Sequence, residues 1–143
     1  MMIAVDTSVW SLVLRRRRVP QDNPCVKAMR SRVEGGDEVV VVGPILQELL
    51  SGLKDPATFA SLEVEMERFP LLELHRRTYA AAARLTNLCH RAGFQPGAVD
   101  ALIAAACVEH GCPLLTADAH FLEIARHCEL VVLPPLGQSG GSG

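Results

Sequence analysis

The amino-acid sequence predicts an α/β fold, a three-layer α/β/α sandwich around a central, mainly parallel sheet of four to five strands. Short apolar runs alternate with longer segments of helical periodicity along the chain. One run, Glu38 to Val42, is almost pure valine, as in a strand buried on both faces of a parallel sheet. The 143 residues suit one domain. We assign residues 1–136 to it, and the terminal 137–143, rich in glycine and serine, to a flexible tail.

The first half of the chain begins with an apolar strand that stops at Asp6, where helical spacing of apolar residues takes over. Asn23-Pro24 opens a second helix and Gly35-Gly36 closes it, because proline suits the first helical turn and glycine the end. Gly43-Pro44 then breaks the valine strand. The predicted elements of this half are strands 2–5 and 38–42 and helices 7–14, 24–33 and 45–53.

The second half contains an alanine-rich helix and a very apolar helix, separated by a loop at 93–97. The apolar helix, Ala98 to His110, is expected to pack centrally, and Gly111 ends it. The predicted elements are helices 57–69, 77–92, 98–110 and 119–127 and strands 71–74, 113–116 and 129–133.

The charge and composition exclude some functions. A formal net charge of -2 gives no overall field that attracts nucleic acid, and 4% aromatic residues argue against a binder built on stacked rings. Any nucleic-acid contact must therefore be local. The run Arg15, Arg16, Arg17 and Arg18 is a candidate for RNA or partner contact, since guanidinium groups bind phosphate in bidentate fashion. A solvated helix end is the alternative.

The five cysteines show no paired spacing, which argues against a disulfide framework and for a reducing, cytoplasmic location. Cys107, His110 and Cys112 could be read as zinc ligands, but they lack a second ligand pair, so buried apolar cysteines are the preferred interpretation. No apolar run approaches the roughly 20 residues that span a membrane.

Four acidic residues stand at the ends of separate predicted elements. Asp6 ends the first strand, and Asp118 follows the strand 113–116. Asp100 lies in the first turn of the apolar helix, and Glu48 lies near the start of the helix after the valine strand. If the two strands are neighbours, these acids meet at the carboxyl edge of the sheet. Taken singly, each could instead cap a helix or face solvent.

Such a cluster raises the pKa of its own members unless a cation balances it. Oxygen ligands without a nearby cysteine or histidine pair favour Mg²⁺, or Mn²⁺, over zinc. Ions of this kind lower the pKa of bound water and stabilise charge on a phosphodiester. We therefore expect metal-dependent phosphodiester hydrolysis.

Four sequence stretches carry a family resemblance that covers nearly the whole chain. They are Ile3-Ala4-Val5-Asp6-Thr7-Ser8, Leu46-Gln47-Glu48-Leu49, Asp100-Ala101-Leu102-Ile103-Ala104-Ala105 and Leu115-Thr116-Ala117-Asp118-Ala119-His120-Phe121. In this order they resemble the four acidic motifs of PIN domains in VapC-type toxins of type II toxin–antitoxin systems. The resemblance implies Mg²⁺-dependent RNA cleavage, with 5′-phosphate and 3′-hydroxyl products expected from direct attack by water. It also implies a VapB-type antitoxin, and apolar helices such as 57–69 leave room for a homodimer.

The resemblance also implies roles for individual residues. Asp6, Asp100 and Asp118 would hold the metal, and Glu48 would complete the catalytic set by orienting the ion or its waters. Three hydroxyl groups would support these ligands by hydrogen bonding, those of Thr7, Ser8 and Thr116. The chain departs from many relatives at His120. At this position many relatives carry an aspartate, which puts a two-metal site in question.

Three other interpretations remain. A noncatalytic PIN-like module that binds RNA or protein is the main alternative, because of His120. A phospho-accepting receiver domain would need a lysine late in the chain, whereas the only lysines are Lys27 and Lys54. A hydrolase with Ser8 or a cysteine as nucleophile lacks the nucleophile-elbow pattern.

Overall fold

The computed structural model describes residues 1–15 and 17–134, so Arg16 and the tail proposed at 137–143 lie outside the described residues. Among the described residues, five strands form one sheet in the order β3-β2-β1-β4-β5. Every strand pair is parallel, as the sequence predicts. The strands are β1 (Met2–Val5), β2 (Glu38–Val42), β3 (Leu71–Leu72), β4 (Leu114–Leu115) and β5 (Val132–Leu133).

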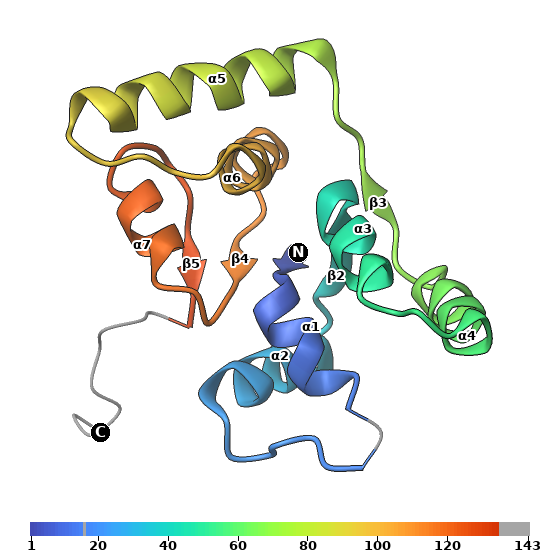
Figure 1. Cartoon of the computed structure of the whole chain (residues 1–143). Helices are drawn as coiled ribbons and strands as arrows, with labels where there is room; N and C mark the ends of the chain where they lie inside the picture. The colour runs from blue at the N-terminus through green and yellow to red at the C-terminus, as the bar shows by residue number, and fades with distance from the viewer. Residues whose placement is uncertain (16, 135–143) are drawn as a thin grey trace.

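Seven helices flank this sheet in the described part of the chain. In Figure 1, α5 crosses the top above α6, α7 lies beside β4 and β5, α1 and α2 lie below, and α4 stands at the right edge. The helices are α1 (Thr7–Val13), α2 (Pro24–Glu34), α3 (Gly43–Ser51), α4 (Pro56–Met66), α5 (Arg76–Arg91), α6 (Ala98–His110) and α7 (His120–Ala125). This arrangement confirms the predicted α/β fold with a central parallel sheet flanked by helices.

The core is built on the two central strands and on α6. Residues 3–5 of β1 and 39–42 of β2 are buried, which confirms that the valine run is covered on both faces. The buried residues of α6 are mostly alanines, and α5 packs closely along this helix. It ends where Gly111 adopts the left-handed conformation, with φ of 64°. None of the described helices is both long and apolar enough to cross a membrane.

Several element boundaries differ from the prediction. Helix α3 begins at Gly43 rather than at residue 45, because Pro44 occupies the first helical turn, where no backbone N–H is needed. Strand β5 covers only the end of the predicted 129–133. The chain turns after α7, where the His127 amide donates a hydrogen bond to the carbonyl of Ile124. The residues between this turn and β5 connect α7 to the sheet.

Candidate metal and active site

The carboxyl ends of β1 and β4 lie side by side at the middle of the sheet. Ala4 is paired with Leu114 and Val5 with Leu115, and the Asp6 amide donates a 2.9 Å hydrogen bond to the carbonyl of Leu115. The residues that follow the two strands are therefore neighbours. This is the juxtaposition on which the sequence argument depends.

Asp6 is buried, with 7% of its surface exposed, and its carboxylate is held by two hydroxyl groups. Ser8 Oγ and Thr116 Oγ1 each donate a 2.8 Å hydrogen bond to Asp6 Oδ2. Although Asp6 occupies the N-cap position of α1, its side chain makes no capping hydrogen bond. The helix-cap interpretation is therefore wrong for the Asp6 carboxylate, which points to the carboxyl end of β4 instead.

The same two hydroxyl groups fix the loop that carries Asp118. Ser8 Oγ accepts a 3.0 Å hydrogen bond from the Ala117 amide, and Thr116 Oγ1 accepts one of 3.0 Å from the Asp118 amide. Each hydroxyl uses its single proton in the hydrogen bond to Asp6, so its oxygen is free to accept a hydrogen bond from a backbone amide of the loop. Asp6 and the backbone of Asp118 are thus joined through one buried hydroxyl, that of Thr116.

Asp118 also organises the turn before α7. Its Oδ1 accepts a 2.9 Å hydrogen bond from the His120 amide and lies 3.2 Å from His120 Nδ1. The Asp118 side chain therefore supports the start of α7, in line with the capping alternative. The His120 ring stands beside this carboxylate, and 73% of its side chain is exposed.

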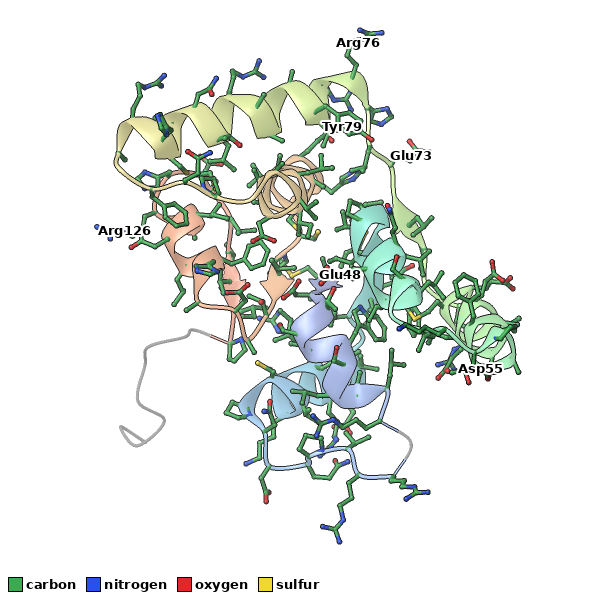
Figure 2. The ribbon with its side chains drawn as sticks, in the orientation of Figure 1. Glu48, Asp55, Glu73, Arg76, Tyr79 and Arg126 are labelled. Carbon is green, nitrogen blue, oxygen red and sulfur yellow. The ribbon has the colours of Figure 1, made fainter. Side chains whose placement is uncertain are left out.

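Glu48 reaches the cluster from α3. The Thr7 hydroxyl donates a 3.2 Å hydrogen bond to Glu48 Oε2, which links the first turn of α1 to α3. In Figure 2, Glu48 lies in the middle of the molecule, whereas Asp55 and Glu73 lie at its edge. The exposed Glu48 side chain is thus directed by a specific contact with the residue that follows Asp6.

The pKa of Asp100 is shifted by its burial and by the other acids. Burial raises the pKa of the Asp100 carboxyl above its usual value, and the negative charges of Asp118, Asp6 and Glu48 raise this pKa further. The imidazole of His120 acts in the opposite direction. The Asp100 carboxyl therefore lies within the electrostatic influence of three acids that come from other parts of the chain.

Hydrogen bonds hold the carboxylates of Asp6, Glu48 and Asp118. No three histidine, cysteine or acidic side chains are arranged to hold a metal ion within residues 1–15 and 17–134. The chemistry of the donor set nevertheless fits a divalent cation. The candidate ligands are all carboxylate oxygens, and their mutual repulsion is the condition that a hard cation relieves.

Other residues singled out in the sequence lie elsewhere. Arg15, Arg17 and Arg18 are exposed and follow the C-terminal end of α1, whereas Asp6 precedes its first turn. Lys27 lies on α2, and Lys54 lies between α3 and α4.

The three residues considered as zinc ligands in the sequence, Cys107, His110 and Cys112, have other contacts in the structure. Cys107 and Cys112 are buried, and His110 Nε2 lies 2.9 Å from the carbonyl oxygen of Glu73. The imidazole of His110 is therefore engaged with the chain that leads from β3 to α5, and the two thiols belong to the core.

One feature of the site was missed by the sequence reasoning. The loop 93–97, expected only to connect two helices, forms a cavity of about 210 Å³ with Asp100, His120 and Ile124. Its own contribution comes from Phe94, Gln95, Pro96 and Gly97. The only signal in the sequence was an aromatic and an amide residue placed shortly before an acidic residue of the cluster.

Comparisons with known proteins find a family and relatives that this chain resembles. The family model described as PIN domain matches residues 3–127. A VapC ribonuclease of Mycobacterium bovis is 32% identical over 127 residues, covering 87% of this chain and 92% of the relative. Ribonuclease VapC11 of Mycobacterium tuberculosis matches with the same identity and coverage.

Solved structures share the fold. The VapBC-1 structure from nontypeable Haemophilus influenzae superimposes with a TM-score of 0.73 at 19% identity, covering 92% of this chain and 96% of the other. VapBC2 from Rickettsia felis, bound to a DNA fragment from its promoter, gives a TM-score of 0.71 at 16% identity, covering 92% and 97%.

Proposed function

Since the chain belongs to the PIN-domain family and to its VapC branch, we propose that it is a Mg²⁺-dependent endoribonuclease and the toxin of a toxin–antitoxin pair. We propose that its products carry 5′-phosphate and 3′-hydroxyl ends. The observation that supports the proposal is that Ser8 and Thr116 fix the Asp6 carboxylate beside the loop of Asp118, while the charges of Asp118, Asp6 and Glu48 help raise the pKa of Asp100. Mn²⁺ is an alternative ion for the same oxygen ligands.

In this proposal Asp6, Asp100 and Asp118 hold the cation, and Glu48 orients it or its waters. When bound, Mg²⁺ supplies an acidified water and neutralises charge on the phosphodiester. Ser8 and Thr116 keep Asp6 Oδ2 occupied, which restricts the rotation of this carboxylate and leaves Oδ1 for a ligand. Thr7 does the same for Glu48. The raised pKa of Asp100 reflects the charge that the cation would offset.

Direct hydrolysis is expected to leave recognisable ends on the RNA. Purified protein should cut a mixed pool of structured cellular RNA at discrete sites with Mg²⁺, and EDTA should abolish the cuts. Water adds to phosphorus and the 3′ oxygen leaves, so the fragments should carry 5′-phosphates that a ligase accepts. Fragments ending in 2′,3′-cyclic phosphate would contradict this route, because they require attack by the ribose hydroxyl. A folded protein that binds RNA without cutting it would instead favour the noncatalytic module.

The arginine run is proposed to grip RNA away from the cut, or an acidic antitoxin segment. A seven-residue helix such as α1 is about 10 Å long, so Arg15, Arg17 and Arg18, which follow it, lie well away from Asp6. Replacing residues 15–18 by alanine should weaken RNA binding about tenfold or more and flatten its salt dependence, at a slope of roughly 0.7 per lost phosphate contact. Filter binding at several salt concentrations measures both, and Mg²⁺ binding should not change. Unaltered affinity for RNA and for the antitoxin would remove this role.

We further propose a VapB-type antitoxin as partner, because the fold is that of toxins solved in VapBC complexes.

We also propose that the protein forms a homodimer. Helix α4 exposes Val64, and a cavity of about 510 Å³ that includes Leu46, Leu50 and Leu71 lies between it and α3. Light scattering of wild type and of Val64→Asp would test α4 as the dimer contact, with loss of the dimer expected in the variant. The cytoplasmic location expected from the cysteine pattern remains part of this proposal.

A further inference from the structure

We propose that the cavity beside Asp100 and His120 is a nucleobase pocket, which receives one base next to the bond that is cut. This inference rests on the proposed nuclease function and deepens it, because it names the part of the substrate that the chain recognises. The cavity shares Asp100 with the carboxylate cluster, and another of its lining residues, His120, lies beside Asp118 of that cluster. A phosphate held at that cluster therefore brings a neighbouring base to the mouth of this cavity.

The size and the walls of the cavity suit a flat heterocycle. Its volume of about 210 Å³ is below the roughly 300 Å³ at which pockets for drug-sized ligands begin, so one ring system fits better than a whole nucleotide. Phe94 supplies an aromatic ring, and Ile124 and Pro96 supply apolar surface. Single-stranded RNA is read by unstacking bases and placing them against such side chains. A ring on an aromatic surface contributes to binding whatever the base, and polar groups then add selectivity.

Gln95 supplies the polar group. Its Oε1 lies 2.8 Å from His90 Nδ1, so the carbonyl end of the amide is engaged by the last turn of α5. The Nε2 amide group is then available to donate to a ring nitrogen or carbonyl of a base. His120 is a second polar lining residue, and its Nδ1 lies 3.2 Å from Asp118 Oδ1.

The loop that forms the cavity is fixed by backbone hydrogen bonds. The Phe94 amide donates a 2.9 Å hydrogen bond to the Cys89 carbonyl, and the Gly93 amide donates one of 3.0 Å to the His90 carbonyl. Gly93 has φ of 88°, which a residue with a side chain rarely adopts. Phe94 is partly buried and packs against the core. The pocket therefore exists before RNA binds, which lowers the entropy lost on binding.

Two variants separate the pocket from the carboxylates. Phe94→Leu keeps an apolar side chain but removes the ring, and Gln95→Ala changes an exposed residue that is not in the core. Cleavage of a randomised RNA pool should show a base preference next to the cut in wild type. Gln95→Ala should flatten this preference, and Phe94→Leu should slow cleavage about tenfold or more whatever the base at that nucleotide. An RNA that is abasic at that nucleotide should be cut at the same rate by all three proteins.

Matched controls and a second measurement decide the outcome. Tyr79→Leu, at the far end of α5, and Gln21→Ala, in the loop before α2, remove an aromatic ring and an amide from exposed sites and should keep the wild-type preference and rate. In EDTA, photo-crosslinking of RNA with 4-thiouridine or 6-thioguanosine at each position in turn should label peptides containing residues 94–97 or His120.

The two failures are distinguishable. Unchanged base preference in Gln95→Ala and an unchanged cleavage rate in Phe94→Leu, with cleavage still dependent on Mg²⁺, would overturn the pocket and leave the nuclease proposal in place. Absence of cleavage by wild type would overturn the nuclease proposal, and crosslinks confined to other segments would then overturn the pocket as well.

Discussion

Asp6→Asn is expected to reduce RNA cleavage at least about 100-fold while the protein remains folded. Loss of a group that merely supports a metal ligand already costs roughly 10- to 100-fold, and Asp6 is proposed to be a ligand itself. Asparagine keeps the shape and can still accept hydrogen bonds from Ser8 and Thr116, so the β1–β4 junction should survive. Cleavage rates with Mg²⁺ measure the loss, and fluorescence of the buried Trp10, the sole tryptophan, reports folding.

A graded series tests whether Asp6 acts through this geometry. Thr116→Val removes one of the two hydroxyl donors and should weaken Mg²⁺ binding roughly 10- to 100-fold, whereas Thr116→Ser should restore much of it. Ser11→Ala, an exposed serine on α1, is the matched control and should change neither property. If Asp6→Asn cuts RNA as fast as wild type, Asp6 does not hold a required ion and the proposed mechanism is wrong.

Much of the fold follows from local pattern. The valine run of β2 and the apolar α6 were predictable because elements in the core have a continuous apolar sequence, which can be interpreted without knowing the neighbouring elements. Their ends were also predictable, since Gly43-Pro44 stops the strand and Gly111 adopts the positive φ that ends the helix. The meeting of Asp6 with Thr116 needed one further assumption, that β1 and β4 are neighbours, and parallel pairing fulfils it.

What could not be predicted depends on contacts between distant segments. The short strands β4 and β5 are defined by their partners rather than by their own composition, so their limits were overestimated. The cavity beside Asp100 forms because the loop 93–97 is drawn against α7, which is far away in the sequence. The link between Thr7 and Glu48 likewise depends on how α1 and α3 pack. Spacing along the chain contains no information on such approaches.

The repulsion at the carboxylate cluster should be visible as a loss of stability that metal reverses. Asp100 has a raised pKa in the folded protein, so the folded state holds its proton more tightly than the unfolded state. The stabilising contribution is therefore complete below the usual aspartate pKa and is lost as pH rises through the folded pKa. In EDTA at neutral pH, Asp100→Asn should raise the Tm above that of wild type. This difference should vanish as pH falls below about 4.

Metal should reverse the order of the two proteins. A ligand present at 100 times its Kd stabilises the folded state by about 2.7 kcal/mol, which for a chain of this size raises Tm by about 10 °C. Mg²⁺ should therefore raise the Tm of wild type and leave Asp100→Asn nearly unchanged, as thermal unfolding with and without EDTA would measure. Asp22→Asn, an exposed acid before α2, is the control and should follow wild type in both conditions.

The Asp100→Asn variant also loses the favourable interaction of an acidic side chain with the first turn of α6, a contribution of about 0.3–1 kcal/mol in the opposite direction. A variant less stable than wild type in EDTA at neutral pH would mean that this helix contribution outweighs the repulsion, and that the acids are too far apart to require a cation.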